Sequence, residues 1–96
     1  MIKKLRMANR VTIYIRKLRY QEAKNRLLHE LDKAFANGYL EAEIIHGIGT
    51  YTLRKMVEEE IAKLDYVRPC SHQPNPGAYH VQFLQIPDDL RKEYLG

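Results

Sequence analysis

Cysteine and long apolar runs are scarce in this sequence of 96 residues, which holds one cysteine, Cys70, and no tryptophan. A single thiol excludes an internal disulfide framework and is typical of proteins in a reducing cytoplasm. No apolar run approaches the roughly 18 residues that a membrane span needs, and the basic segment MIKKLRMANR lacks the apolar stretch of a secretory signal. We therefore expect a cytoplasmic protein that does not enter a membrane.

Acidic residues are missing from the first 19 positions, which hold seven lysines and arginines. The whole chain has 16 basic and 12 acidic side chains, a net charge of +4, so the rest of the chain is net acidic. Such asymmetry indicates an anionic partner that meets the N-terminal part of the chain. The alternative is a solvated basic arm that only aids solubility.

The spacing of apolar residues predicts five elements in one domain with a single core. Stretches rich in β-branched, apolar or aromatic residues predict three strands, at 11–15, 42–46 and 79–86. Apolar residues three and four positions apart predict two helices, at 20–37 and from about residue 50 to 64. Prolines mark 68–77 as a loop.

The order β-α-β-α-β predicts a small two-layer α/β sandwich with a largely parallel sheet, although the last strand can pair in either direction. Because only two helices are predicted, one face of the sheet should be covered better than the other. In this interpretation residues 1–10 form a basic N-terminal arm, 11–86 the domain and 87–96 a C-terminal tail.

The segment EIIHGIGTYTLR joins the second predicted strand to the second predicted helix. Gly47 and Gly49 lack the Cβ atoms that would block left-handed backbone angles or the close approach of a ligand. The turn that holds these two glycines is called the corner below. A helix that begins near Thr50, capped by that residue or by Thr52, points its free N–H groups and positive dipole end at the corner. Arg54 follows one turn later, so we predict a phosphate-binding site. An ordinary tight turn is the alternative.

The first predicted strand brings further groups to the same edge, because parallel strands end side by side. Tyr14 and Arg16 share one face of that strand, and Lys17 follows. Four cations are therefore expected at this edge: Arg16, Lys17, Arg54 and a protonated His46. Together with one aromatic ring and no carboxylate, they suit a phosphodiester chain. Histidines at strand ends are also common structural hydrogen-bond donors, so both roles of His46 stay open.

Other kinds of chemistry have weaker support in the sequence. The corner lacks the third glycine of a dinucleotide-binding fingerprint and the Gly-Lys-Ser/Thr of a P-loop. Cys70, His72 and His80 fit no zinc pattern, so no metal site is predicted. The acidic run 58–60 is assigned to the solvated side of the second helix.

Residues 44–54 match, at every fixed position, the central signature I-I-H-G-x-G-x-x-x-L-R of the Smr (small MutS-related) domain family, which the chain therefore resembles. Residues 18–23, LRYQEA, resemble the start of the family's first helix, and 77–84, GAYHVQFL, resemble its closing segment more loosely. The resemblance spans about residues 11–85. It implies a fold similar to the C-terminal domain of the bacterial third translation initiation factor. It also implies nucleic-acid binding and, in several members, endonuclease or nicking activity on DNA or RNA.

Carried over from the family, the HGxG…LR positions are occupied here by His46, Gly47, Gly49, Leu53 and Arg54. Arg16 occupies the His/Arg position of the family's first motif, L-D-x-H/R-G. Tyr14 stands in place of that motif's acid, Lys17 in place of its glycine, and Tyr51 in place of a usual glycine of the corner. Because phosphodiester hydrolysis needs a group to activate water and usually carboxylates to hold a metal, these departures favour binding over cleavage.

Three hypotheses stay open. The first is a nucleic-acid-binding module with a degenerate nuclease site, in which Tyr14 or Tyr51 stacks on a base. Its predicted phosphate ligands are Arg16, Lys17, His46, Gly47, Gly49, Thr50 and Arg54. The second is an active endonuclease with His46 as catalytic residue, Glu22 as the missing carboxylate and, only in that case, a divalent metal. The third is a protein-interaction module that no longer binds nucleic acid. For the first two we expect branched DNA, or structured or single-stranded RNA, as partner, and no other cofactor.

Overall fold

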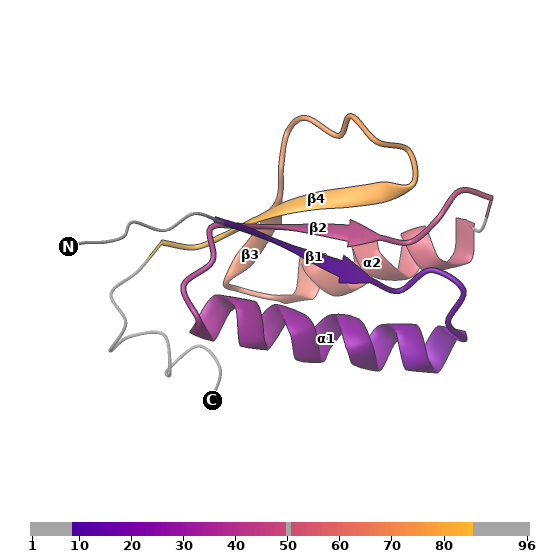
Figure 1. Cartoon of the computed structure of the whole chain (residues 1–96), viewed down its shortest axis with the longest axis horizontal. Coiled ribbons are helices and arrows are strands. Elements are labelled where there is room, and N and C mark those ends of the chain that lie inside the picture. The colour runs from indigo at the N-terminus through magenta and orange to yellow at the C-terminus, as the bar shows by residue number, and fades with distance from the viewer. Residues whose placement is uncertain (1–8, 50, 86–96) are drawn as a thin grey trace.

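The computed structural model describes residues 9–49 and 51–85. Its elements are β1 (Arg10–Tyr14), α1 (Tyr20–Ala36), β2 (Glu41–Ile45), α2 (Tyr51–Lys63), β3 (Val67–Pro69) and β4 (Ala78–Phe83). Both helices lie against one face of the sheet, and the loop before β4 stands above the other face (Figure 1). The small two-layer α/β sandwich is therefore confirmed. Most of the predicted arm, Thr50 and the predicted tail lie outside the described residues, whereas Arg10 belongs to β1.

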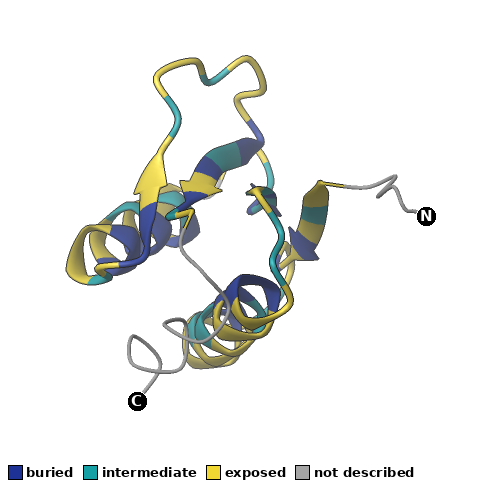
Figure 2. Cartoon of the chain, turned by 90° about the vertical axis from the view of Figure 1, so that its left-hand side faces the viewer, coloured by how far each residue is buried: buried dark blue, intermediate teal, exposed yellow. Residues whose placement is uncertain are grey.

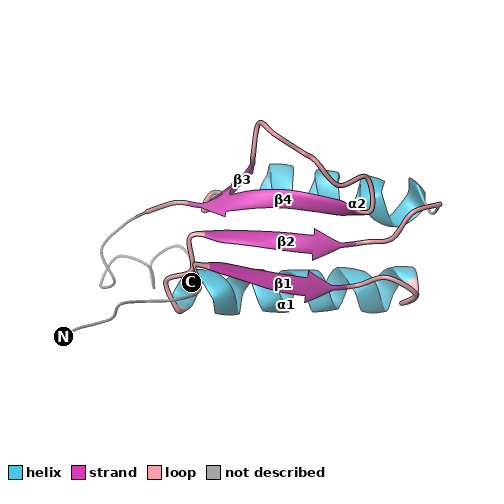
Figure 3. Ribbon diagram, turned by 45° about the horizontal axis from the view of Figure 1, so that its top comes forward, coloured by secondary structure: helices cyan, strands magenta, loops and turns pink. Residues whose placement is uncertain are grey.

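The sheet is mixed, which corrects the expectation of a largely parallel one. Its strand order is β1-β2-β4-β3; β1 and β2 pair in parallel, while β4 pairs antiparallel with both of its neighbours. Figure 3 shows β4 running against β1 and β2. The reason is β3, which was predicted as part of a loop. A short loop, 70–77, turns the chain back from β3 and inserts β4 between the two strands that α2 connects.

The core fills the space between the sheet and the two helices (Figure 2). The apolar stripe of α1 that the sequence predicted is buried: Ala23, Leu27, Leu31, Ala34 and Phe35. The stripe of α2 contributes Leu53, Met56, Val57 and Ile61. At the far end from the corner, Phe35 stacks on Tyr66 with ring centroids 4.5 Å apart, and the Tyr66 hydroxyl donates a hydrogen bond to Asp32. This packing fixes both helices on the sheet.

Charged side chains also tie the two helices together. Glu60 is buried, and its carboxylate lies 3.5 Å from Lys24 of α1 and 3.1 Å from Lys63 of α2. The acidic run at 58–60 is therefore not wholly on the solvated side of the helix, as the sequence suggested. No helix in the described part of the chain is long and apolar enough to span a membrane.

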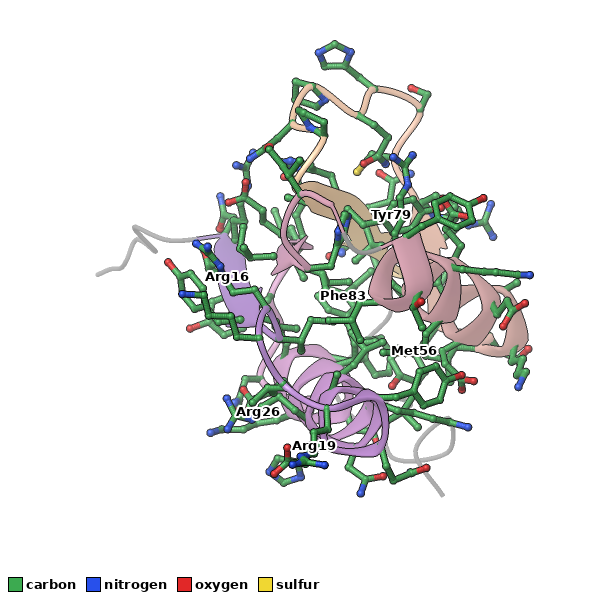
Figure 4. All side chains as sticks on the ribbon, turned by 90° about the vertical axis from the view of Figure 1, so that its right-hand side faces the viewer. Arg16, Arg19, Arg26, Met56, Tyr79 and Phe83 are labelled. Atoms are coloured by element: carbon green, nitrogen blue, oxygen red, sulfur yellow. The ribbon has the colours of Figure 1, made fainter. Side chains whose placement is uncertain are left out.

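The parallel pairing of β1 and β2 places two strand-to-helix connections at one edge of the sheet. Tyr14, the last residue of β1, is aligned with Ile45, the last residue of β2. The turn into α1 and the corner into α2 therefore lie side by side, on the right in Figure 1. Figure 4 views this edge end-on, with Arg16 beside β1 and Met56 between the two helices. The edge predicted to hold the site is formed as expected.

Candidate nucleic-acid interface

Two glycines shape the corner between β2 and α2. Gly47 has φ +89° and Gly49 has φ +96°, backbone angles that residues with side chains rarely adopt. A Cβ added to Gly47 would stand 3.4 Å from the Cβ of Arg16, whereas one added to Gly49 would meet nothing within 4 Å. Gly47 therefore lets the corner lie against the neighbouring turn, and Gly49 leaves open space above it.

The loop before β4 is fastened to the corner through Gly77. Its carbonyl oxygen accepts hydrogen bonds from the N–H groups of His46 and Gly47, both at 3.0 Å. The N–H of Gly47 is therefore already used within the protein, and its binding of phosphate stays a prediction. The N–H groups of Ile48 and Gly49 have no partner among the residues that the structure describes. These two donors, with those of the first turn of α2, are the backbone groups left for an anion.

His46 is buried, with 2% of its surface exposed, and it follows directly after β2. Its Nδ1 lies 2.9 Å from the carbonyl oxygen of Gly47. Because a carbonyl only accepts hydrogen bonds, we assign the proton to Nδ1, which leaves a lone pair on Nε2. That Nε2 is buried and has no partner in the described part of the chain. The imidazole thus carries a hydrogen-bond acceptor that is shielded from solvent in this structure.

The charge of His46 differs from the expectation. Burial, the largest cause, and the nearby positive charge of Arg54 lower the pKa of His46 below its usual value of 6.5; the bond to Gly47 and the charge of Glu58 oppose this. The side chain is therefore neutral at pH 7. His46 is therefore not one of the cations of this edge, contrary to the prediction from the sequence.

Arg54 and Glu58 form an ion pair on α2. The Nε of Arg54 donates to Oε2 of Glu58 at 3.0 Å, one turn along the helix. Among the described residues the two terminal nitrogens of Arg54 have no partner, so they can still bind an anion. Glu58 also contributes, after burial, to the raised pKa of Tyr79. A carboxylate therefore lies close to the site, although the sequence analysis predicted none there.

A pocket of about 230 Å³ opens at the corner. Its lining residues are His46, Gly47, Ile48, Gly49, Tyr51, Arg54 and Pro76. A second hollow of about 300 Å³ lies on the side of β1, lined by Arg16, Ile45, Gly47, Ile48, Asn75 and Gly77. The two share Gly47 and Ile48 and are therefore neighbours. The structure thus brings Arg16 and Arg54 to the two sides of one corner, as the sequence predicted.

The turn from β1 into α1 carries Arg16 and Lys17. The N–H of Leu18 donates to the carbonyl of Ile15 at 3.3 Å, and Lys17 has φ +67°, in the left-handed region. Both basic side chains are exposed and have no acidic partner among the residues described. Tyr14 is exposed too and, because Ile13 and Ile15 on either side of it are buried, points away from the helices.

Two predictions concerned the carboxylates of Glu22 and Glu58. Glu22, proposed as a substitute for the family's acid, accepts a hydrogen bond from the Arg19 N–H at 3.3 Å and so belongs to the capping box of α1. Glu58 is on the solvated side, as predicted, with 39% of its side chain exposed, and it also pairs with Arg54. Its spacing of four residues from Arg54 is the sequence signal that would have found it. Within the described ranges, no three His, Cys, Asp or Glu side chains gather as metal ligands.

Comparison with known proteins agrees with this geometry. Residues 13–82 match the sequence profile of the Smr domain. The protein named Endonuclease MutS2 of Staphylococcus epidermidis is 37% identical over 73 residues, which cover 75% of this chain and 9% of that protein. Its namesake from Streptococcus pyogenes serotype M1 is 34% identical over 65 residues, covering 68% of this chain and 8% of that protein. The chain thus spans less than a tenth of the length of these relatives.

A solved structure shares the fold. The crystal structure of the Smr domain of Thermus thermophilus MutS2 matches with a TM-score of 0.65 and 22% identity, covering 77% of this chain and 98% of that one. The profile match extends from Ile13 in β1 to Gln82 in β4 and includes the whole glycine corner. A likeness to translation initiation factor three stays a prediction. On its profile match and its sequence relatives, the chain belongs to the Smr domain family.

Proposed function

We propose that this domain binds the phosphodiester backbone of a nucleic acid at the corner between β2 and α2. The Smr family is related to nucleic-acid binding and to nucleases, as in MutS2. The observation that carries the proposal is the corner pocket, whose lining includes Arg54 and the glycine turn in which the N–H groups of Ile48 and Gly49 are free of partners in the described chain. Free N–H donors and a helix N-terminus suit the oxygens of a phosphate.

The electrostatics of the edge support an extended anion better than a small one. Arg16 lies in the hollow beside the corner pocket, and Lys17 follows it in the same turn. Arginine can bind a phosphate with two donors at once, while lysine acts as a point charge. If Arg16, Lys17 and Arg54 each neutralise one phosphate, the logarithm of the binding constant falls against the logarithm of salt concentration with a slope of about −2 to −3.

We further propose that this site binds without cleaving. Tyr14 replaces the acid of the family's first motif, and none of the described residues that line the corner pocket is acidic. Glu22 is engaged at the start of α1. A phenol hydroxyl does not take a proton from water as a carboxylate does. The domain therefore keeps groups that hold phosphate, whereas the acid of the first motif is missing and the nearby Glu58 is paired with Arg54.

A specific observation favours endonuclease activity as the second candidate. His46 is neutral, its Nδ1 proton is held by Gly47, and its Nε2 lone pair is free of protein partners in the described chain. A neutral imidazole with a free lone pair can take a proton from water or a sugar hydroxyl, once a shift of the buried ring lets that group reach Nε2. In that case Glu58, rather than Glu22, is the nearest acidic group in contact with the residues of the pocket. A divalent metal remains a prediction only for this candidate.

One incubation, analysed in two ways, tests both candidates. Labelled branched DNA and a structured RNA are mixed with the protein in Mg²⁺, Mn²⁺ or chelator, and are run on native and denaturing gels. We expect a shifted band on the native gel and no new fragments. Arg54→Gln should weaken binding by about tenfold. Lys33→Gln, on the exposed end of α1 away from the edge, is the matched control for loss of one charge.

Other outcomes are equally informative. Fragments that disappear with His46→Gln, provided that the variant keeps the circular dichroism of the parent, would overturn the binding-only proposal in favour of the endonuclease. An unaltered affinity in Arg54→Gln would place binding elsewhere on the domain. The absence of any salt-sensitive binding to DNA or RNA would favour the third hypothesis, a protein-interaction module.

A further inference from the structure

A third hollow lies beside the corner pocket, between the starts of the two helices. It measures about 310 Å³ and is lined by Tyr20, Tyr51, Thr52, Lys55, Met56 and Glu59. Tyr51 also lines the corner pocket, so the two spaces adjoin. Figure 4 shows Met56 between α1 and α2 in the end-on view of this edge. None of the predicted phosphate ligands that the structure describes lines this hollow.

The walls of the hollow suit a flat aromatic ligand. Tyr20 is 45% exposed and Tyr51 is 72% exposed, and they come from the first residues of different helices. Met56 is almost fully buried and lies between them as apolar lining. Tyrosine rings that face solvent beside a phosphate site are the groups on which nucleobases stack. The Smr family usually has a glycine at the position of Tyr51, so this side of the hollow differs from the family pattern.

Two opposite charges sit in the hollow without protein partners in the described chain. Lys55 and Glu59 are four residues apart on α2, and neither appears in an ion pair or hydrogen bond. A carboxylate accepts hydrogen bonds only, and an ammonium donates only. Lys55 and Glu59 therefore fit a ligand that presents one hydrogen-bond acceptor next to two donors. The Watson–Crick edge of guanine has this order: O6 accepts, and N1–H and the 2-amino group donate.

The other bases fit less well for the same reason. Adenine and cytosine each offer one amino donor beside an acceptor nitrogen, which a carboxylate repels. Thymine and uracil offer a single N–H between two carbonyl oxygens. Glu59 can bind two donors side by side only on guanine, and Lys55 then lies next to O6. Because this edge is used in base pairing, the guanine must be unpaired.

We propose that this hollow binds one unpaired guanine of a nucleic acid whose phosphate lies at the corner. Tyr20 and Tyr51 hold the ring, Glu59 accepts from N1–H and the 2-amino group, and Lys55 donates to O6. This inference rests on the proposed function, because the corner supplies most of the affinity and brings the base to the hollow. It adds a base preference and a requirement for single-stranded substrate.

The probe is a fluorescent thymidine oligonucleotide of about 12 nucleotides, with or without a single central guanine. One guanine cannot form a quadruplex, so both probes stay single-stranded. We expect the guanine probe to bind about tenfold more tightly, in the range of a two-donor base contact. Glu59→Gln should remove this ratio, and Tyr20→Ala should weaken the guanine probe more than the all-thymidine probe.

The control for loss of one negative charge is Asp65→Asn, an exposed position just beyond the far end of α2, which should keep the ratio. Equal binding of the two probes by the parent protein, with normal salt dependence, would overturn the guanine pocket and leave the proposed function intact. A ratio that survives in Glu59→Gln would also overturn it. Salt-insensitive or undetectable binding of both probes would overturn the pocket and the proposed function together.

Discussion

Gly47 lies directly against Arg16, since a Cβ added to Gly47 would stand 3.4 Å from the Cβ of that arginine. Gly47 also has φ +89°, which disfavours any side chain. We therefore expect Gly47→Ala to destabilise the domain by about 1–2 kcal/mol, the usual cost of a left-handed L-residue, and to disturb Arg16. The free energy of unfolding in urea measures the first effect.

Gly49→Ala is the matched control for this change. Gly49 has φ +96°, but an added Cβ would meet nothing within 4 Å. It should cost a similar backbone strain without displacing Arg16. Weaker phosphate binding is therefore expected mainly in Gly47→Ala, after correction for stability. Equal losses of affinity in the two variants would show that the contact with Arg16 does not matter for binding.

Lys17 carries backbone strain that a glycine would relieve. Its φ of +67° is left-handed, and the family motif has glycine at this position. Lys17→Gly should raise the free energy of unfolding by about 0.5–1 kcal/mol, because relief of strain exceeds the added flexibility of the unfolded chain. The same change removes a cation, so affinity for nucleic acid should fall and its salt slope should drop by about one.

Lys17→Gly is thus expected to raise stability and to lower affinity for nucleic acid. Lys17→Gln removes the charge but keeps the strain, so it should weaken binding without the gain in stability. If Lys17→Gly were no more stable than Lys17→Gln, the left-handed backbone would not be costly here. If both kept the affinity of the parent, Lys17 would not contact phosphate. Urea unfolding and a salt titration of binding give the two readings.

Local pattern was enough to predict most of the fold. Ile13, Ile44 and Val81 lie in stretches rich in β-branched, apolar or aromatic residues, and the stripe from Ala23 to Phe35 has helical spacing. These signals depend only on near neighbours in the sequence. β3 has no such signal, because it is a three-residue edge strand that ends in Pro69. Missing it led to the wrong sheet, since β4 is inserted between β2 and β3.

Local sequence pattern was also enough to predict which residues of the corner lie together, but not how they are buried or bonded. Gly47, Gly49 and Arg54 lie close together in the sequence, so their convergence needed only a turn between strand and helix. The link from Gly77 to His46 joins residues 31 positions apart and has no local pattern. Burial of His46, and hence its neutral charge, depends on that link and on the packing around β2. Charge and solvent access at a site therefore required the structure.

The buried His46 predicts a pH dependence of stability. Burial lowers its pKa below the unfolded value of 6.5, so the unfolded chain binds a proton more readily. The free energy of unfolding is therefore not reduced by His46 above pH 6.5. It decreases as the pH falls from 6.5 through the pKa of His46 in the folded state. Unfolding in urea at pH 7.5 and 5.5 should show a larger loss in the parent than in His46→Gln. Parallel curves would contradict the lowered pKa.

Glu58→Gln separates binding from cleavage at the corner. Glu58 pairs with Arg54 at 3.0 Å and offsets part of its positive charge. Removing the carboxylate costs about 0.3–0.5 kcal/mol of helix stability, as for an exposed pair four residues apart. It frees Arg54, so affinity for a phosphodiester should rise by about two- to fivefold and be most evident at low salt. Fluorescence anisotropy with one DNA probe measures this.

The same variant tests the alternative function. If the domain were an endonuclease that relied on Glu58 as its carboxylate, Glu58→Gln would bind at least as tightly as the parent and cut far less. If the domain only binds, the variant differs from the parent in affinity alone. Asp65→Asn controls for the change in net charge. Weaker binding in Glu58→Gln would mean that Glu58 orients Arg54 toward the phosphate, and that their ion pair is part of the binding site.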